Sequence, residues 1–229
     1  MSTLYVVATP IGNLEDISPR ALRILKEVNT VLCEDTRLTK KLLSHYDIHT
    51  MTLSYHANSA DSKEEKIIAL LREGKDLALV SDAGTPAISD PGSKLVSVLR
   101  AAFSPEELSV IAIPGPSALT AALSVSGLPS SDFLFLGFLP HKKGRNTLFE
   151  EIAASTRTVA FYESPHRLMK TLDALVEKLE PSRTLVVARE ISKIYEEVVS
   201  DTPEEVQKFF LANPDKVRGE FVLMVDGRS

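Results

Sequence analysis

The chain has 229 residues, of which 44% are hydrophobic and 25% are charged. This length and composition suffice for one large or two small domains with buried cores, and they exclude a disordered or fibrous protein. The formal net charge is −5 at pH 7, so the protein lacks the basic field of a general nucleic-acid binder. Any contact with nucleic acid therefore has to come from local basic patches.

Cysteine and histidine usage narrows the chemistry further. The single cysteine, Cys33, lies in an apolar run, so neither a disulfide nor a thiolate metal cluster can be built. The histidines show no zinc-binding spacing, and we expect no metal. The chain begins without a leader pattern, and it has no run of about 18 apolar residues that could span a membrane. We therefore expect a cytoplasmic protein without membrane contact.

Along the first 113 residues, short apolar runs alternate with amphipathic helical stretches, which is typical of a mainly parallel sheet covered by helices. Ser18 and Pro19 predict the start of one helix. A capping box from Ser62 to Glu65 predicts the start of another, which Gly74 ends. We expect strands at residues 4–8, 31–33, 77–80 and 110–113, with a further apolar segment at residues 51–53.

The run Pro114-Gly115-Pro116 predicts a joint between two domains, because two prolines fix the backbone there. Ser117 can cap the next helix, at residues 118–125. We accordingly divide the chain into residues 1–113 and 114–229, each an α/β domain. In the second domain we expect strands at residues 133–136, 158–162, 184–188 and 221–225 and helices at residues 145–153, 165–179 and 203–211. A strand at residues 194–199 would make this sheet mixed.

Two common nucleotide-binding motifs are absent from the sequence. No G-x-G-x-x-G follows a strand and no G-x-x-x-x-G-K-[ST] occurs, which disfavours a dinucleotide fold and a P-loop. Instead, polar loops rich in small residues follow the expected strands, where they can meet at a common cleft. A single loop of this kind can be only a tight turn. The loops lie at residues 8–14, 82–92, 114–118, 161–167, 188–190 and 219–221.

In this order the loops resemble those of the tetrapyrrole-methylase superfamily, over nearly the whole chain. The segments that carry the resemblance are Val7 to Leu14, Cys33 to Arg37, Ser54 to His56, Asp82 to Gly92, Pro114 to Ala118 and Phe161 to Arg167. The resemblance implies two α/β domains of the class III methyltransferase fold, S-adenosylmethionine in the cleft between them, and a homodimer.

The resemblance is strongest to the ribosomal RNA branch of the superfamily. Gly84-Thr85-Pro86 stands where tetrapyrrole-modifying relatives carry Gly-Asp-Pro. The branch implies 2′-O-methylation of a cytidine in the decoding region of 16S ribosomal RNA, with the RNA or the assembled 30S subunit as partner. Many members of this branch continue into a helical extension beyond the segment Gly219 to Val225. If that extension helps to hold RNA, we expect weaker RNA binding here or a contribution from a partner subunit.

Methyl transfer mainly requires that donor and nucleophile are held in line with water excluded. Gly84 and Gly115 can let backbone groups approach the cofactor without a Cβ in the way. Ser117 and Asp90 could instead only cap the helices that follow them. The cofactor-binding residues that the resemblance implies are Pro10, Gly84, Thr85, Pro86, Ser89, Asp90, Ser117, Ala118, Phe161, Tyr162, Ala188, Gly219 and Glu220.

A ribose hydroxyl is a poor nucleophile until its proton is removed. His56 is the first candidate for the base, because it follows the apolar segment 51–53 and an imidazole ordinarily titrates near neutral pH. Asp35, Glu163 and Glu34 are rivals, and positioning alone could supply most of the rate. The candidate phosphate contacts are Arg37, Lys142, Lys143, Arg145, His166 and Arg167, although a short basic run can equally be a solvated face.

Two other functions stay open from the sequence. A methylase of the same fold could act on a corrin or tetrapyrrole, or on a protein as diphthine synthase does. A ribosome-associated RNA-binding module without catalysis is the third interpretation. The basic runs at Lys142 and His166 favour the RNA methyltransferase, because they suit phosphate better than a carboxylated macrocycle.

Overall fold

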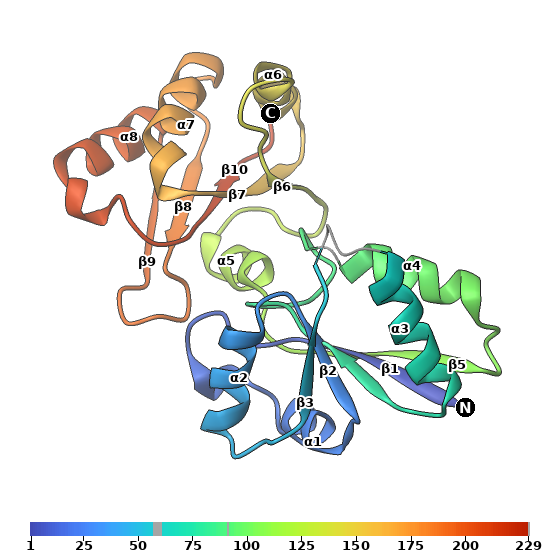
Figure 1. The fold of residues 1–229 in the computed structure, drawn as a ribbon. Coiled ribbons are helices and arrows are strands. Elements are labelled where there is room, and N and C mark those ends of the chain that lie inside the picture. Colours follow the sequence, from blue (N-terminus) through green and yellow to red (C-terminus); the bar gives the residue numbers. More distant parts are fainter. Residues whose placement is uncertain (57–60, 91, 229) are drawn as a thin grey trace. The chain divides into compact units, whose positions relative to one another are not determined.

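The computed structural model describes residues 1–56, 61–90 and 92–228. The chain forms two compact units, Met1–Ser117 and Ala118–Ser229, and each unit contains one five-stranded sheet with helices (Figure 1). The expected α/β class with two α/β domains is confirmed. The second unit begins with Ala118, the first residue of helix α5.

The sheet of the first unit is parallel throughout, with the strand order β3-β2-β4-β1-β5. Because helices cover both faces of such a sheet, its strands are apolar on both sides. One core contains Ala21 and Leu25 from α1, and the other contains Ile67 from α3 and Leu95 from α4. The strands are β1 (Ser2–Val7), β2 (Thr30–Cys33), β3 (Met51–Ser54), β4 (Leu77–Leu79) and β5 (Leu108–Ile113).

Helix α1 (Pro19–Glu27) begins at the expected cap, where the Ser18 hydroxyl accepts a hydrogen bond from the backbone N–H of Ala21 at 3.1 Å. Helix α3 (Asp61–Arg72) lies where the capping box predicted a helix. Helix α4 (Gly92–Ala102), on which Leu95 and Leu99 are buried, follows Asp90, the residue that could cap a helix there. Helix α2 (Thr36–His45), on which only Thr39 and Leu43 are buried, was not predicted. Its basic residues are typical of a solvated surface segment.

The sheet of the second unit is mixed, as predicted, with the order β6-β7-β10-β8-β9. Strands β6 and β7 are parallel, and β10 runs antiparallel to both β7 and β8. The strand expected at residues 194–199 is found at Glu197–Asp201, because residues 190–196 form turns in which Glu190 and Ser192 have positive φ. The strands are β6 (Phe133–Phe138), β7 (Thr158–Glu163), β8 (Leu185–Arg189), β9 (Glu197–Asp201) and β10 (Phe221–Val225).

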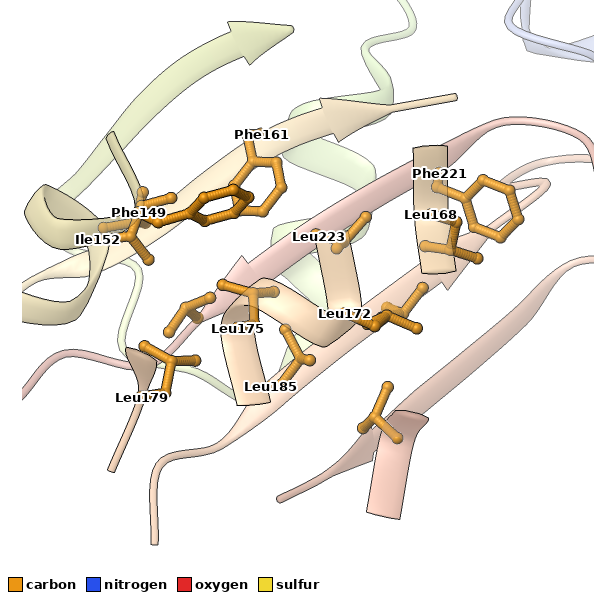
Figure 2. Close-up of a cluster of buried hydrophobic side chains, with 14 of the residues drawn as sticks. Phe149, Ile152, Phe161, Leu168, Leu172, Leu175, Leu179, Leu185, Phe221 and Leu223 are labelled. Carbon is orange, nitrogen blue, oxygen red and sulfur yellow. The ribbon is translucent and has the colours of Figure 1, made fainter. Parts of the chain in front are cut away.

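The core of the second unit lies between this sheet and helices α6 (Arg145–Ala154), α7 (Pro165–Lys178) and α8 (Pro203–Ala212). Leu168, Leu172 and Leu175 repeat at helical spacing along α7, and they pack against Phe161 of β7 and Leu223 of β10 (Figure 2). Helix α5 (Ala118–Ser126) contacts β8, β9 and β10. This packed core holds the strands of the second sheet, and hence the loops at their ends, in a defined position.

Replacing Leu172 by alanine should therefore lower the free energy of unfolding of this unit by about 2–5 kcal/mol, because the side chain is fully buried and leaves a cavity. The matched control is Leu211→Ala on α8, whose side chain is 63% exposed. Its cost should stay within about 0.5 kcal/mol. Urea unfolding followed by circular dichroism measures both, and equal losses in the two variants would contradict the packing described.

Candidate functional site

The loops after the strands of the first sheet meet around Gly84. Because all five strands are parallel, their carboxyl ends share one edge. The backbone N–H of Thr9, after β1, donates to the carbonyl of Gly84 at 2.9 Å, and the Gly84 N–H donates back to Thr9 at 3.0 Å. The Thr85 hydroxyl, after β4, donates to the carbonyl of Pro116 at 3.1 Å. Three loops far apart in sequence are thus fixed to one another.

Glycine is required where these loops touch. Gly84 has a φ of 84°, and a Cβ there would lie 3.3 Å from Cγ2 of Ile11. A Cβ on Gly115 would lie 3.0 Å from that of Ala8. The absence of a Cβ at these two glycines therefore allows the neighbouring loops of the same unit to pack closely against them.

The loop after β4 carries backbone strain. Ala87 and Ser89 have φ values of 70° and 57°, a left-handed conformation that costs a non-glycine residue on the order of 1–3 kcal/mol. The Asp90 carboxylate accepts a hydrogen bond from the backbone N–H of Gly92 at 3.2 Å. Pro86 is buried and Ser89 is exposed. Such strain is concentrated in loops that bind ligands.

Three carboxylates, those of Glu34, Asp82 and Asp90, influence one another at this edge of the first sheet. Partial burial, together with the neighbouring carboxylates of Asp82 and Asp90, raises the pKa of Glu34, and His56 opposes that shift. Burial also raises the pKa of Asp90, and Asp82 adds to the effect. Acidic groups that shift one another in this way favour a positively charged ligand group. Asp82 was not among the predicted residues, although its position directly after a buried strand was a signal for it.

His56 and Asp35 follow neighbouring strands at this edge. The backbone N–H of Tyr55 donates to the carbonyl of Cys33 at 2.8 Å, so the chain beyond β3 stays beside the chain beyond β2. His56 lies close enough to Glu34 to shift its pKa. The predicted base and its rivals Glu34 and Asp35 thus follow neighbouring strands.

Asp35 has a structural partner. It is the N-cap of α2, and its carboxylate accepts from the Arg37 side chain at 3.1 Å and 2.7 Å. The Arg37 side chain and backbone N–H lower the pKa of Asp35 to about 2. A carboxylate with so low a pKa is a weak base near neutral pH. Arg37, a predicted phosphate contact, is 86% exposed while it makes this ion pair.

The second sheet gathers most of the remaining predicted residues at one of its edges. Because β10 is antiparallel, its first residue Phe221 lies opposite Glu163 of β7 and Arg189 of β8. Gly219 and Glu220 therefore lie beside the carboxyl ends of both strands. Residues 139–144 follow β6, which is parallel to β7, and reach the same edge.

The predicted cofactor residues of the second unit differ in what they can offer a ligand. Phe161 and Ala188 are fully buried in strands that are paired on both sides, so neither residue presents an accessible group to a ligand. Tyr162 lies 5.0 Å from Phe135 between ring centroids, and burial raises its pKa. Gly219 has a φ of 90° and lies against Glu190, whose carboxylate accepts from the backbone N–H of Glu220 at 3.0 Å. Ala118 and Ser117 adjoin the boundary between the units.

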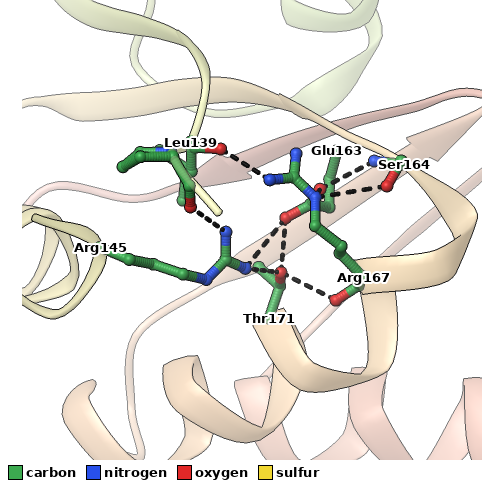
Figure 3. A network of polar contacts seen from close by, with 7 residues as sticks. Leu139, Arg145, Glu163, Ser164, Arg167 and Thr171 are labelled. Atoms are coloured by element: carbon green, nitrogen blue, oxygen red, sulfur yellow. Dashed lines mark hydrogen bonds and ion pairs between the residues drawn. The ribbon is translucent and has the colours of Figure 1, made fainter. Parts of the chain in front are cut away.

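The predicted basic and acidic residues of this edge fall into two groups. Lys142, Lys143 and His166 are exposed. Arg145, Arg167 and Glu163 instead form a network whose side chains are 14%, 15% and 0% exposed (Figure 3). Glu163 thus offers no side-chain surface to a substrate hydroxyl, which favours a role other than the predicted one as base. The network also includes Thr171, which carried no sequence signal because its role depends on three-dimensional contacts.

Among the described residues, no group of three or more His, Cys, Asp or Glu side chains could hold a metal ion. Within the same part of the chain, no helix is long and apolar enough to cross a membrane.

The family model for tetrapyrrole (corrin/porphyrin) methylases matches residues 3–207 of the chain. The chain belongs to the tetrapyrrole methylase family. The resemblance drawn from the loop motifs is thereby confirmed, and with it the expected fold.

Relatives within the tetrapyrrole methylase family are similar over almost the whole chain. A protein of Halalkalibacterium halodurans named ribosomal RNA small subunit methyltransferase I is 48% identical over 227 residues, which cover 98% of this chain and 76% of the relative. A protein of the same name from Xylella fastidiosa is 48% identical over 226 residues, covering 98% and 81%. The solved structure of uroporphyrin-III C-methyltransferase from Thermus thermophilus, complexed with S-adenyl homocysteine, has a TM-score of 0.65 at 19% identity and covers 98% of this chain and 97% of that chain.

Proposed function

We propose that this chain transfers a methyl group from S-adenosylmethionine to the ribose 2′-hydroxyl of a cytidine in the decoding region of small-subunit ribosomal RNA. The observation that carries the proposal is the 48% identity, over 98% of the chain, to relatives named ribosomal RNA small subunit methyltransferase I. The chain is an S-adenosylmethionine-dependent methyltransferase of the tetrapyrrole methylase family. What we propose beyond this is that the methyl group goes to the ribose 2′-hydroxyl and that the nucleotide is a cytidine.

The edge of the first sheet fits the cofactor. The carboxylates of Glu34, Asp82 and Asp90 would complement the positive charge of a sulfonium. The strained loop from Gly84 to Ser89, which is hydrogen-bonded to neighbouring loops at Gly84 and Thr85, would provide backbone groups for hydrogen bonds to the cofactor. The bound cofactor would supply the methyl group, and the chain's task is to orient it and exclude water. The cofactor contacts predicted in the second unit, such as Tyr162 and Gly219, are part of this proposal.

The edge of the second sheet suits RNA. The net charge of −5 means that phosphate contacts must be concentrated in a few basic residues. Lys142, Lys143 and His166 are exposed there and available to phosphate oxygens. The proposed substrate is free ribosomal RNA or the 30S subunit. The same basic residues would bind phosphates in either substrate.

We propose His56 as the base, because it directly follows Tyr55, whose backbone N–H donates to Cys33 at the edge where we propose that the cofactor binds. Asp35→Asn should then lower the single-turnover methylation rate by less than about tenfold, since Asp35 is a weak base whose carboxylate is occupied by Arg37. Asparagine can still cap α2. Rapid-quench measurement of methyl transfer tests this, and a loss of about 10²-fold would return the base role to Asp35.

Labelled S-adenosylmethionine tests the proposed activity directly. Small subunits that lack the modification, free ribosomal RNA, a tetrapyrrole and ribosome-free protein extract are offered in parallel reactions. Label in RNA supports the proposal. Label in the macrocycle or in a protein alone would favour the other methylases of this fold, and cofactor binding without label in any acceptor would favour a binding module.

We also propose a cytoplasmic homodimer, as the resemblance implies. Sedimentation equilibrium of the purified chain should give twice the mass of one chain. A single-chain mass over the whole concentration range would overturn this part of the proposal.

A further inference from the structure

Glu163 is the centre of a buried charge network at the edge of the second sheet. Its carboxylate forms an ion pair with Arg167, at 2.7 Å from Nε, and accepts hydrogen bonds from a guanidinium nitrogen of Arg145 at 3.1 Å and from the Thr171 hydroxyl at 2.6 Å. It also accepts from the backbone N–H of Ser164 at 2.8 Å. All these interactions lie within the second unit (Figure 3).

Each arginine also contacts the loop of residues 139–144. Arg167 donates to the carbonyl of Leu139 at 2.7 Å, and Arg145 donates to that of Pro140 at 3.1 Å. Arg145 is itself the residue that ends this loop and begins α6. One carboxylate therefore holds both the beginning and the end of the loop that carries Lys142 and Lys143.

At the start of the loop Leu139 is buried in the core of the second unit, whereas the segment that follows it has few restraints. Gly144, at the N-cap of α6, has a φ of 80° and provides no side-chain cap. The hydrogen bond from the Arg145 N–H to the Lys142 carbonyl measures 3.2 Å. His141, Lys142 and Lys143 are exposed. The network is therefore the polar restraint that lies on both sides of the exposed segment with the two lysines.

The composition of the network also suits an anion-binding edge. Two guanidinium groups on one carboxylate leave a net positive charge beside the loop. Burying such a group adds little stability compared with an apolar replacement, because desolvation offsets the Coulomb attraction. What it does provide is a fixed geometry, since the planar guanidinium donates in several set directions at once.

We propose that Glu163 is a positioning residue for RNA binding, which acts through Arg145 and Arg167 to hold Lys142 and Lys143 in one arrangement toward phosphates. The inference rests on the proposed function of these lysines as phosphate contacts. It replaces the predicted role of Glu163 as a base.

The test uses Arg167→Lys in the full-length protein. Lysine keeps the positive charge but cannot pair with Glu163 and donate to the Leu139 carbonyl together in the same geometry. RNA affinity should fall on the order of tenfold, with S-adenosylmethionine affinity unchanged. Trypsin cleavage after Lys142 and Lys143 should become about tenfold faster, because the loop opens more often. The matched control is Arg157→Lys, whose ion pair with Asp132 is exposed, and it should change neither readout.

A double-mutant cycle separates positioning from general destabilisation. In a Lys142→Ala/Lys143→Ala background, Arg167→Lys should cost RNA binding much less, because the groups that it positions are gone. If Arg167→Lys does not fold, Thr171→Val is used with the same readouts, since it removes the hydroxyl between Arg145 and Glu163 without changing charge.

The two proposals fail in different ways. If Lys142→Ala/Lys143→Ala leaves RNA affinity and its salt dependence unchanged, the proposed RNA surface is wrong. If the lysine pair matters but Arg167→Lys alters neither cleavage nor RNA affinity, the positioning role of the network is overturned. The same holds if the loss caused by Arg167→Lys is undiminished in the lysine-free background.

Discussion

Replacing His56 by asparagine should lower the single-turnover rate of methyl transfer by about 10²-fold or more, while RNA and cofactor affinities stay nearly the same. The reason is that the ribose hydroxyl must lose its proton, and His56 lies beside Glu34 at the edge proposed for the cofactor. Rapid quench with saturating cofactor measures the rate, and calorimetry and filter binding measure the affinities.

The control for His56 is His49→Asn, because His49 is exposed and pairs with Asp47 on the surface. It should leave the rate unchanged. If His56→Asn preserves the rate but weakens RNA binding, His56 is a binding residue. The base role would then pass to Glu34, whose pKa is raised by burial and by Asp82 and Asp90, and not to Asp35, whose pKa is about 2.

Replacing Gly84 by leucine should abolish binding of S-adenosylmethionine. The left-handed φ of 84° strains any other residue, and the new Cβ would lie 3.3 Å from Ile11. The side chain would push apart the loops after β1 and β4, which the paired hydrogen bonds between Thr9 and Gly84 now hold together. Isothermal calorimetry measures the loss.

Gly74→Leu is the matched control for Gly84→Leu. Gly74 has nearly the same φ, 82°, but nothing lies within 4 Å of a Cβ added there. The Gly74→Leu variant should be less stable because of backbone strain, but it should retain its affinity for S-adenosylmethionine. Unchanged affinity in Gly84→Leu, with both variants folded by circular dichroism, would remove the cofactor from this edge.

Much of the fold could be predicted because its signals are local. Strands such as β4 and β10 are short, wholly buried apolar runs, and α7 repeats leucines at helical spacing. Helix α2 was missed because its buried face is narrow and its basic residues resemble a surface loop. Strand β9 was placed too early because the positive φ of Ser192 has no clear sequence signal in a non-glycine residue.

The candidate site could be predicted only in part. The loops of the first sheet were found because parallel strands bring their carboxyl ends to one edge. The contacts of Glu163 could not be predicted, because its partners Arg145, Arg167 and Thr171 come from two helices, and only the structure brings them together. From the sequence alone, Glu163 is equally consistent with a base, and Arg145 and Arg167 with phosphate contacts.

Nucleoside analysis of the methylated RNA tests the central claim most directly. Small subunits lacking the modification are incubated with the protein and labelled S-adenosylmethionine, and the extracted 16S RNA is digested to nucleosides for mass spectrometry. We expect the label in 2′-O-methylcytidine, from one position in the decoding region. Label on a nucleobase, or in a nucleoside other than cytidine, would contradict the proposed reaction.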